Sequence, residues 1–184
     1  DPYGKHDTML EARLQHFDTI EQDAPVQQRL ISLRHPPIKF AHRGARAHAQ
    51  ENTIDAFVLA LQLGATGLET DVWLTSDGIP ILNHGGLLRT GIRRRTVGTF
   101  RKEDLPPHIP TLRELYQACG NKFELSIDMK DQSAVEPVIE TSREFEAETK
   151  LWLCHEDWKV AASWRDSTSA HLVNSTRLRV MKDG

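Results

Sequence analysis

Cysteine and long hydrophobic runs are the two features that this 184-residue sequence most lacks. The only cysteines, Cys119 and Cys154, stand in apolar contexts without the close spacing of metal ligands, so we expect reduced core residues and no disulfide. Reduced thiols weakly favour a reducing compartment, and a cytoplasmic location is therefore expected. Because no run of about 20 apolar residues occurs, the sequence predicts no transmembrane segment.

A strong excess of charge of either sign is also missing. The 23 Lys and Arg residues nearly balance the 26 Asp and Glu residues, which leaves a formal net charge of -3. Such a balance provides no basic field for nucleic acid, and we expect no nucleic-acid partner. One local exception is a cationic segment, expected as a loop, that contains Arg89, Arg93, Arg94 and Arg95.

Short apolar runs alternate with amphipathic segments from residue 37 onward. This alternation predicts repeated strand-helix units and a parallel sheet, whereas residues 1–36 are polar with helical spacing and predict an N-terminal helical extension. Strands are expected at 38–41, 67–74, 123–129, 151–154 and 171–173. Helices are expected at 54–61, 111–119, 133–145 and 158–168. The fold class is therefore α/β, with residues 37–184 as one domain.

Local signals set the boundaries of several of these elements. Thr111-x-x-Glu114 and Ser133-x-x-Glu136 both match the pattern of a helix-capping box. Asp77-Gly78 predicts a tight turn, after which an extended segment at 79–82 would return His84 toward the strand ends.

Acidic side chains share one face of two expected strands. Period-two geometry places Glu69 and Asp71 on one face of the second strand, and Glu124 and Asp128 on one face of the third. In an antiparallel sheet this face could simply meet water, but helical connections would bury it. Buried carboxylates repel one another unless a cation neutralises them. We therefore predict that Glu69, Asp71 and Asp128 bind a divalent metal, Mg²⁺ or Ca²⁺, since both ions prefer oxygen ligands.

Two histidines stand next to this acidic face. His42 ends the first expected strand and His84 follows the extended return segment, so both would lie where the carboxylates open. Phosphodiester cleavage needs one group to accept a proton and another to donate one, and imidazoles do both near neutral pH. We predict His42 and His84 as this acid/base pair.

The predicted site also contains cations that suit phosphate. Arg43 offers a planar donor fork and Lys130 a point charge, although salt bridges to the neighbouring acids are the alternative for both. Glu51 is expected either to orient the site or to favour a helix N-terminus. Gly44 would permit a sharp turn out of the first strand.

The run AHRGARAHAQENTIDAFVLALQLGATGLETDVWLTSDGIPILNH, together with Ile109-Pro110-Thr111-Leu112 and Asp128-x-Lys130, resembles the glycerophosphodiester phosphodiesterase family. The resemblance implies a (β/α)₈ barrel and hydrolysis of a glycerophosphodiester to glycerol 3-phosphate and an alcohol. It also implies His42 and His84 as acid and base, Arg43 and Lys130 as phosphate contacts, and a divalent metal on the carboxylates. Glu51 is predicted to support the residues that contact the substrate.

The sequence departs from the family pattern in three ways, of which Gln50, in place of the proline that commonly precedes Glu51-Asn52-Thr53, is minor. Gly85 follows the second histidine where the family commonly has aspartate. A complete barrel takes about 250 residues, so 184 residues leave room for about five strand-helix units, and we expect a C-terminally truncated fragment. Three alternatives therefore stay open: a related barrel phospholipase that forms a cyclic phosphate, a non-catalytic module that binds glycerophosphate or lipid headgroups, and a structural barrel fragment.

Overall fold

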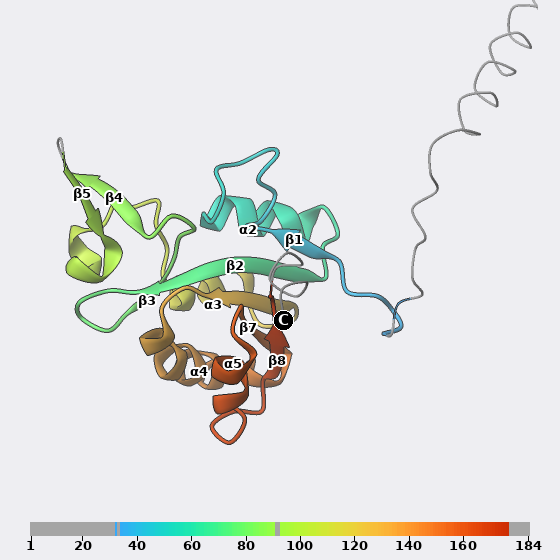
Figure 1. Ribbon diagram of the computed structural model, residues 1–184. Helices are drawn as coiled ribbons and strands as arrows, with labels where there is room; N and C mark the ends of the chain where they lie inside the picture. The colour runs from blue at the N-terminus through green and yellow to red at the C-terminus, as the bar shows by residue number, and fades with distance from the viewer. Residues whose placement is uncertain (1–31, 33, 91–92, 177–184) are drawn as a thin grey trace, which may run out of the picture. The chain divides into compact units, whose positions relative to one another are not determined.

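A computed structural model of the chain describes residues 32, 34–90 and 93–176 (Figure 1). All the strands and helices discussed below belong to one compact unit that begins at Ile38. The predicted helical extension over residues 1–36 lies almost wholly outside the described residues. None of the described helices is both long enough and apolar enough to cross a bilayer.

A parallel sheet forms the centre of this unit. Its strand order is β1, β2, β6, β7, β8, with β3 paired antiparallel to the far end of β2. The five parallel strands are β1 (Phe40–His42), β2 (Gly67–Leu74), β6 (Glu124–Met129), β7 (Leu151–His155) and β8 (His171–Asn174), and β3 covers Pro80–Leu82. This arrangement confirms the predicted α/β class and the expected five parallel strands.

Helices connect the strands as the alternating pattern predicted. The α-helices are α2 (Ile54–Gln62), α3 (Leu112–Cys119), α4 (Val135–Glu144) and α5 (Trp158–Ser163). Short 3₁₀ turns are η1 (Val97–Thr99), η2 (Lys102–Asp104), η3 (Gln132–Ala134) and η4 (Glu148–Lys150). Both halves of the predicted capping box between Thr111 and Glu114 form at the start of α3.

Two predicted helix boundaries were wrong. Ser133 does not cap α4, because the Asp131 carboxylate accepts the Ser133 amide and starts η3 one turn earlier. The last helix ends at Ser163 instead of continuing to about residue 168. Beyond it, residues 164–167 form turns in which amides bond the carbonyl three residues earlier, while Arg143 donates to the Ser167 carbonyl and Glu148 accepts from Thr168.

The cationic segment is a β-hairpin, whereas the sequence predicted a loop. It consists of β4 (Leu87–Thr90) and β5 (Arg93–Thr96), which pair antiparallel in a separate two-stranded sheet. In Figure 1 this hairpin projects from the sheet beyond the end of β2.

The main core covers one face of the parallel sheet. Leu68 and Val72 of β2 and Leu125 and Ile127 of β6 are essentially buried against the helices. The intervening residues point to the opposite face, as the period-two prediction required. That opposite face therefore presents the polar side chains of β2 and β6.

Candidate active site

The edge of β2 opposite β6 brings the two histidine segments together. The Arg43 amide donates to the Glu69 carbonyl at 2.9 Å, and the Asn83 amide donates to the Asp71 carbonyl at 3.0 Å. These carbonyls are two residues apart on one strand, a rise of roughly 7 Å. His42 precedes Arg43 and His84 follows Asn83, so the structure places both predicted histidines beside the same short stretch of β2.

A sharp turn follows His42. Arg43 has a left-handed backbone with φ of 57°, and Gly44 has φ of 76°. A Cβ atom on Gly44 would lie 2.7 Å from the carbonyl carbon of Ala56 in α2. Glycine is therefore required both by conformation and by close helix approach, which confirms the turn predicted for Gly44.

The three predicted carboxylate ligands lie on the face opposite the core. Asp71 pairs in register with Asp128 on β6, and Glu69 stands two residues before Asp71. The Asp71 side chain is 3% exposed, whereas those of Glu69 and Asp128 are 22% and 34% exposed. Asp71 is thus the deepest charge of the group.

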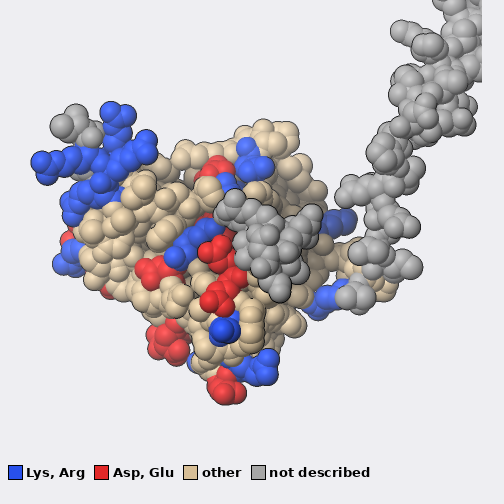
Figure 2. All heavy atoms as spheres, viewed as in Figure 1, with Lys and Arg blue, Asp and Glu red and all other residues tan. Residues whose placement is uncertain are grey.

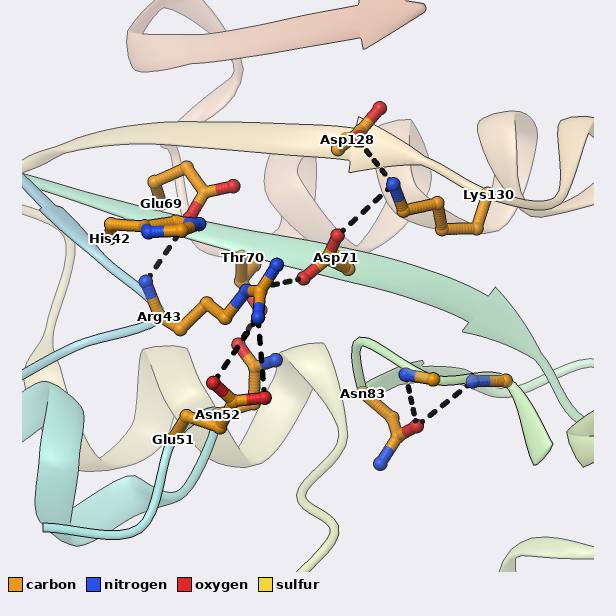
Figure 3. Close-up of polar contacts among 12 residues, drawn as sticks. His42, Arg43, Glu51, Asn52, Glu69, Thr70, Asp71, Asn83, Asp128 and Lys130 are labelled. Carbon is orange, nitrogen blue, oxygen red and sulfur yellow. Dashed lines mark hydrogen bonds and ion pairs between the residues drawn. The ribbon is translucent and has the colours of Figure 1, made fainter. Parts of the chain in front are cut away.

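Two cations reach Asp71 from opposite sides (Figure 3). Arg43 Nε lies 3.3 Å from Asp71 Oδ2, and Lys130 Nζ lies 3.3 Å from Asp71 Oδ1. Beyond them, Arg43 Nη1 pairs with Glu51 at 3.2 Å, and Lys130 Nζ hydrogen-bonds Asp128 Oδ2. Charges therefore alternate in one row from Glu51 to Asp128. The salt-bridge geometry foreseen as the alternative for Arg43 and Lys130 is present.

This row is short of positive charge. With Glu69 ionised, Glu51, Glu69, Asp71 and Asp128 carry four negative charges against the two of Arg43 and Lys130, which leaves an excess of two. Burial, followed by the charge of Asp71, raises the pKa of Glu69 from 4.5 to about 7. The pKa of Lys130 is lowered by burial but raised more by Asp128 and Asp71, so the net shift is upward.

The donors suit a hard divalent cation in chemistry and in charge. Carboxylate oxygens are the ligands that Mg²⁺ and Ca²⁺ prefer. Asp71 Oδ2 is buried and accepts no hydrogen bond within the described part of the chain. Among the described residues, however, no three His, Cys, Asp or Glu side chains form a metal-binding group, and Lys130 lies between Asp71 and Asp128. The three carboxylates share a face, and their role as ligands stays a prediction.

His42 borders this row, and His84 lines an adjacent pocket. His42 Nε2 lies 3.7 Å from Glu69 Oε2, and burial together with Arg43 and Arg46 lowers the His42 pKa below 6.5. His84 is exposed and lines a cavity of about 130 Å³ together with Glu51. The structure thus places His42 beside Glu69 and His84 at the adjacent cavity, so both histidines lie next to the charged row.

Asn52 is a site residue whose role the sequence did not reveal. It precedes Thr53, whose side chain caps α2. Asn52 is 4% exposed with φ of 56°, and its Oδ1 accepts a 2.9 Å hydrogen bond from Thr70. Its Nδ2 is buried without a hydrogen-bond partner among the described residues, and Asn52 lines the same cavity as His84. Asparagine adopts a left-handed backbone more readily than most residues, and this preference was the sequence signal that could have drawn attention to Asn52.

The model of the glycerophosphoryl diester phosphodiesterase family matches residues 42–161 of the chain. The chain belongs to this family. A glycerophosphodiester phosphodiesterase from Caldanaerobacter subterraneus subsp. tengcongensis is 35% identical over 116 residues, which cover 54% of this chain and 48% of the relative. Glycerophosphodiester phosphodiesterase 1 of Homo sapiens is 40% identical over 102 residues, which cover 44% of this chain and 30% of the relative. The chain therefore spans about half or less of these family members.

Solved structures of the family share the fold. A glycerophosphodiester phosphodiesterase from Thermotoga maritima superposes with a TM-score of 0.64 at 27% identity, covering 71% of this chain and 59% of that chain. A structure described as a glycerophosphoryl diester phosphodiesterase from Silicibacter pomeroyi superposes with a TM-score of 0.66 at 21% identity, covering 74% of this chain and 63% of that one. The parallel sheet thus corresponds to part of the family's barrel, as the resemblance implied.

Proposed function

We propose that this chain forms part of an enzyme that hydrolyses glycerophosphodiesters to glycerol 3-phosphate and an alcohol. The row of alternating charges through Arg43, Asp71, Lys130 and Asp128, with His42 beside it, carries the proposal. The row lies toward the carboxyl ends of parallel strands, where barrel enzymes have their active sites. Family membership and the names of the curated relatives support the same reaction.

In this proposal Glu69, Asp71 and Asp128 hold one divalent cation, Mg²⁺ or Ca²⁺. The excess of two negative charges and the raised pKa of Glu69 support a cation at this place. When bound, such an ion would offset negative charge on the phosphoryl oxygens.

The histidines would exchange protons with the substrate. The lowered pKa of His42 keeps its imidazole neutral near pH 7, so it can accept a proton from the attacking glycerol 2-hydroxyl or from water. His84 would supply a proton to the leaving alkoxide from its place at the cavity rim.

Arg43 and Lys130 would contact the phosphate, and Glu51 would orient Arg43. Both Glu51 oxygens accept from Arg43 Nη1, at 3.3 and 3.2 Å, so the guanidinium is held before substrate arrives. A guanidinium offers five N–H donors, so phosphate oxygens can be bound in addition to the carboxylates. The buried Nδ2 of Asn52 offers one further hydrogen-bond donor at the cavity that His84 lines.

A phosphate-binding module without turnover is the second candidate. Gly85 favours it, because glycine follows His84 where the family commonly has aspartate, and glycine has no side chain that could orient the imidazole. The same contacts by Arg43 and Lys130 would then serve binding alone.

The deciding experiment measures release of glycerol 3-phosphate from glycerophosphocholine, with Mg²⁺ or Ca²⁺, by the whole protein that contains this chain. We expect His42→Ala and His84→Ala each to lower turnover by about 100-fold or more. His48→Ala, which changes an exposed loop histidine, is the matched control. Full activity in the two variants would reject the assigned roles, a lasting cyclic phosphate product would favour the phospholipase reaction, and binding without turnover would favour the module.

A further inference from the structure

The β4–β5 hairpin places arginines directly opposite one another. Arg89 pairs in register with Arg94, and Arg95 pairs with Leu88. Like charges directly opposite on antiparallel strands destabilise a hairpin. Within the described parts of the chain, no acidic side chain forms an ion pair with Arg93 or Arg94. Arg94 therefore faces a like charge without an acidic partner among the described residues, a cost that an external anion would relieve.

One face of the hairpin packs against the protein, and the other face points outward. Leu88 packs against the small second core that includes Phe100, and the Arg95 guanidinium lies 4.5 Å from the centre of the Phe100 ring. Because side chains alternate along strands, Leu87, Arg89 and Arg94 share the opposite face. Leu87 is 51% exposed there. The outward face thus combines two cations with an exposed apolar side chain.

Charge is distributed unevenly between the hairpin and the remainder of the chain. The whole chain carries -3, and the hairpin arginines contribute four positive charges, so the other residues together carry -7. Figure 2 shows Lys and Arg side chains gathered over the hairpin, at one end of the visible face. A projecting cationic hairpin on a protein whose other residues carry net negative charge favours contact with an anionic surface at the hairpin.

We propose that the β4–β5 hairpin docks the protein on a negatively charged lipid bilayer. Lipid phosphates would accept from the paired arginines, whose planar donor forks match phosphate geometry, while Leu87 would enter the headgroup region. A nucleic acid fits less well, because its binding takes many phosphate contacts along a long basic surface. The hairpin has four residue pairs, a length of roughly 13 Å, which is short for such a surface. The docking surface does not depend on the proposed hydrolysis.

The test measures binding of the complete chain to sedimented vesicles of phosphatidylcholine, with or without a minority of phosphatidylglycerol. We expect binding only to the vesicles with phosphatidylglycerol, and weaker binding as salt rises. Arg89→Ala with Arg94→Ala should lower binding about 30-fold, since each arginine near an anionic surface contributes about fivefold. Arg89→Lys with Arg94→Lys should keep most of it.

The matched control is Lys122→Ala with Arg165→Ala, which removes the same charge from exposed positions elsewhere. This control should bind anionic vesicles within about twofold of the unchanged chain. Thermal unfolding confirms that each variant is folded. Equal loss in the hairpin and control variants, equal binding to both kinds of vesicle, or stronger binding to duplex DNA than to anionic vesicles would each overturn the proposal.

Discussion

Lys130 Nζ lies 3.3 Å from Asp71 Oδ1, and this contact joins two neighbouring parallel strands at the most buried charge of the site. Among the described residues, Arg43 is the one other cation in contact with the Asp71 carboxylate. Each cation therefore offsets part of the cost of burying Asp71. Stability and the proposed function would then depend on the same few side chains.

Removing Lys130 should destabilise the protein through Asp71. We expect Lys130→Met to lower the free energy of unfolding by about 1–3 kcal/mol, because Asp71 would keep its charge with one partner fewer. In the Asp71→Asn background the same change should cost at least about 1 kcal/mol less. Denaturant unfolding of the four proteins measures this coupling. Additive costs would show that the pair contributes nothing.

The stability of the metal-free protein should fall as pH rises from 4.5 to about 7, the interval through which the pKa of Glu69 is raised. In this interval the folded protein keeps a proton that the unfolded chain has lost, so folding is favoured at the lower pH. The pKa shift of Glu69 corresponds to a loss of roughly 3 kcal/mol in the free energy of unfolding across this interval. Unfolding of the wild type and of Glu69→Gln across this range tests it, since the variant should lose most of this slope. An unchanged slope in the variant would assign the effect to another group.

Divalent cations should stabilise the wild-type protein at pH 8, where Glu69 is ionised. Thermal unfolding with increasing Mg²⁺ or Ca²⁺ should show a rise in Tm that saturates. We expect Asp128→Asn to weaken the apparent affinity by at least about tenfold. Glu136→Gln removes an equal charge from an exposed position on α4 and serves as control. Equal responses of the two variants would indicate unspecific ion binding.

Gly44 should tolerate alanine far less well than Gly64 does. Both have positive φ, at 76° and 91°, so each substitution meets backbone strain of about 1 kcal/mol. Gly44 alone would also bring a Cβ atom to 2.7 Å from the Ala56 carbonyl carbon, whereas Gly64 faces open space. We expect Gly44→Ala to cost about 3 kcal/mol and Gly64→Ala about 1 kcal/mol in chemical denaturation. Equal costs would show that α2 yields to the added methyl group.

Much of the fold could be predicted because its signals are local. Alternation along β2 predicted which face Leu68 and Asp71 occupy, and Thr111 with Glu114 predicted the start of α3. The Ser133 motif failed because Asp131, two residues earlier, competes for the same amide. A pattern alone does not rank two such acceptors, since their relative geometry depends on where β6 ends.

For the candidate site, the sequence determined which groups are present and which strand faces bear them, because side-chain periodicity follows directly from backbone geometry. Only the tertiary structure decided which cation meets which carboxylate. Asp71 lies between Arg43 and Lys130 because β1 and β6 flank β2 on opposite sides, and His84 approaches because β3 occupies the edge of β2 beyond β1. Such contacts arise from strand order and register, which bring together residues far apart along the chain.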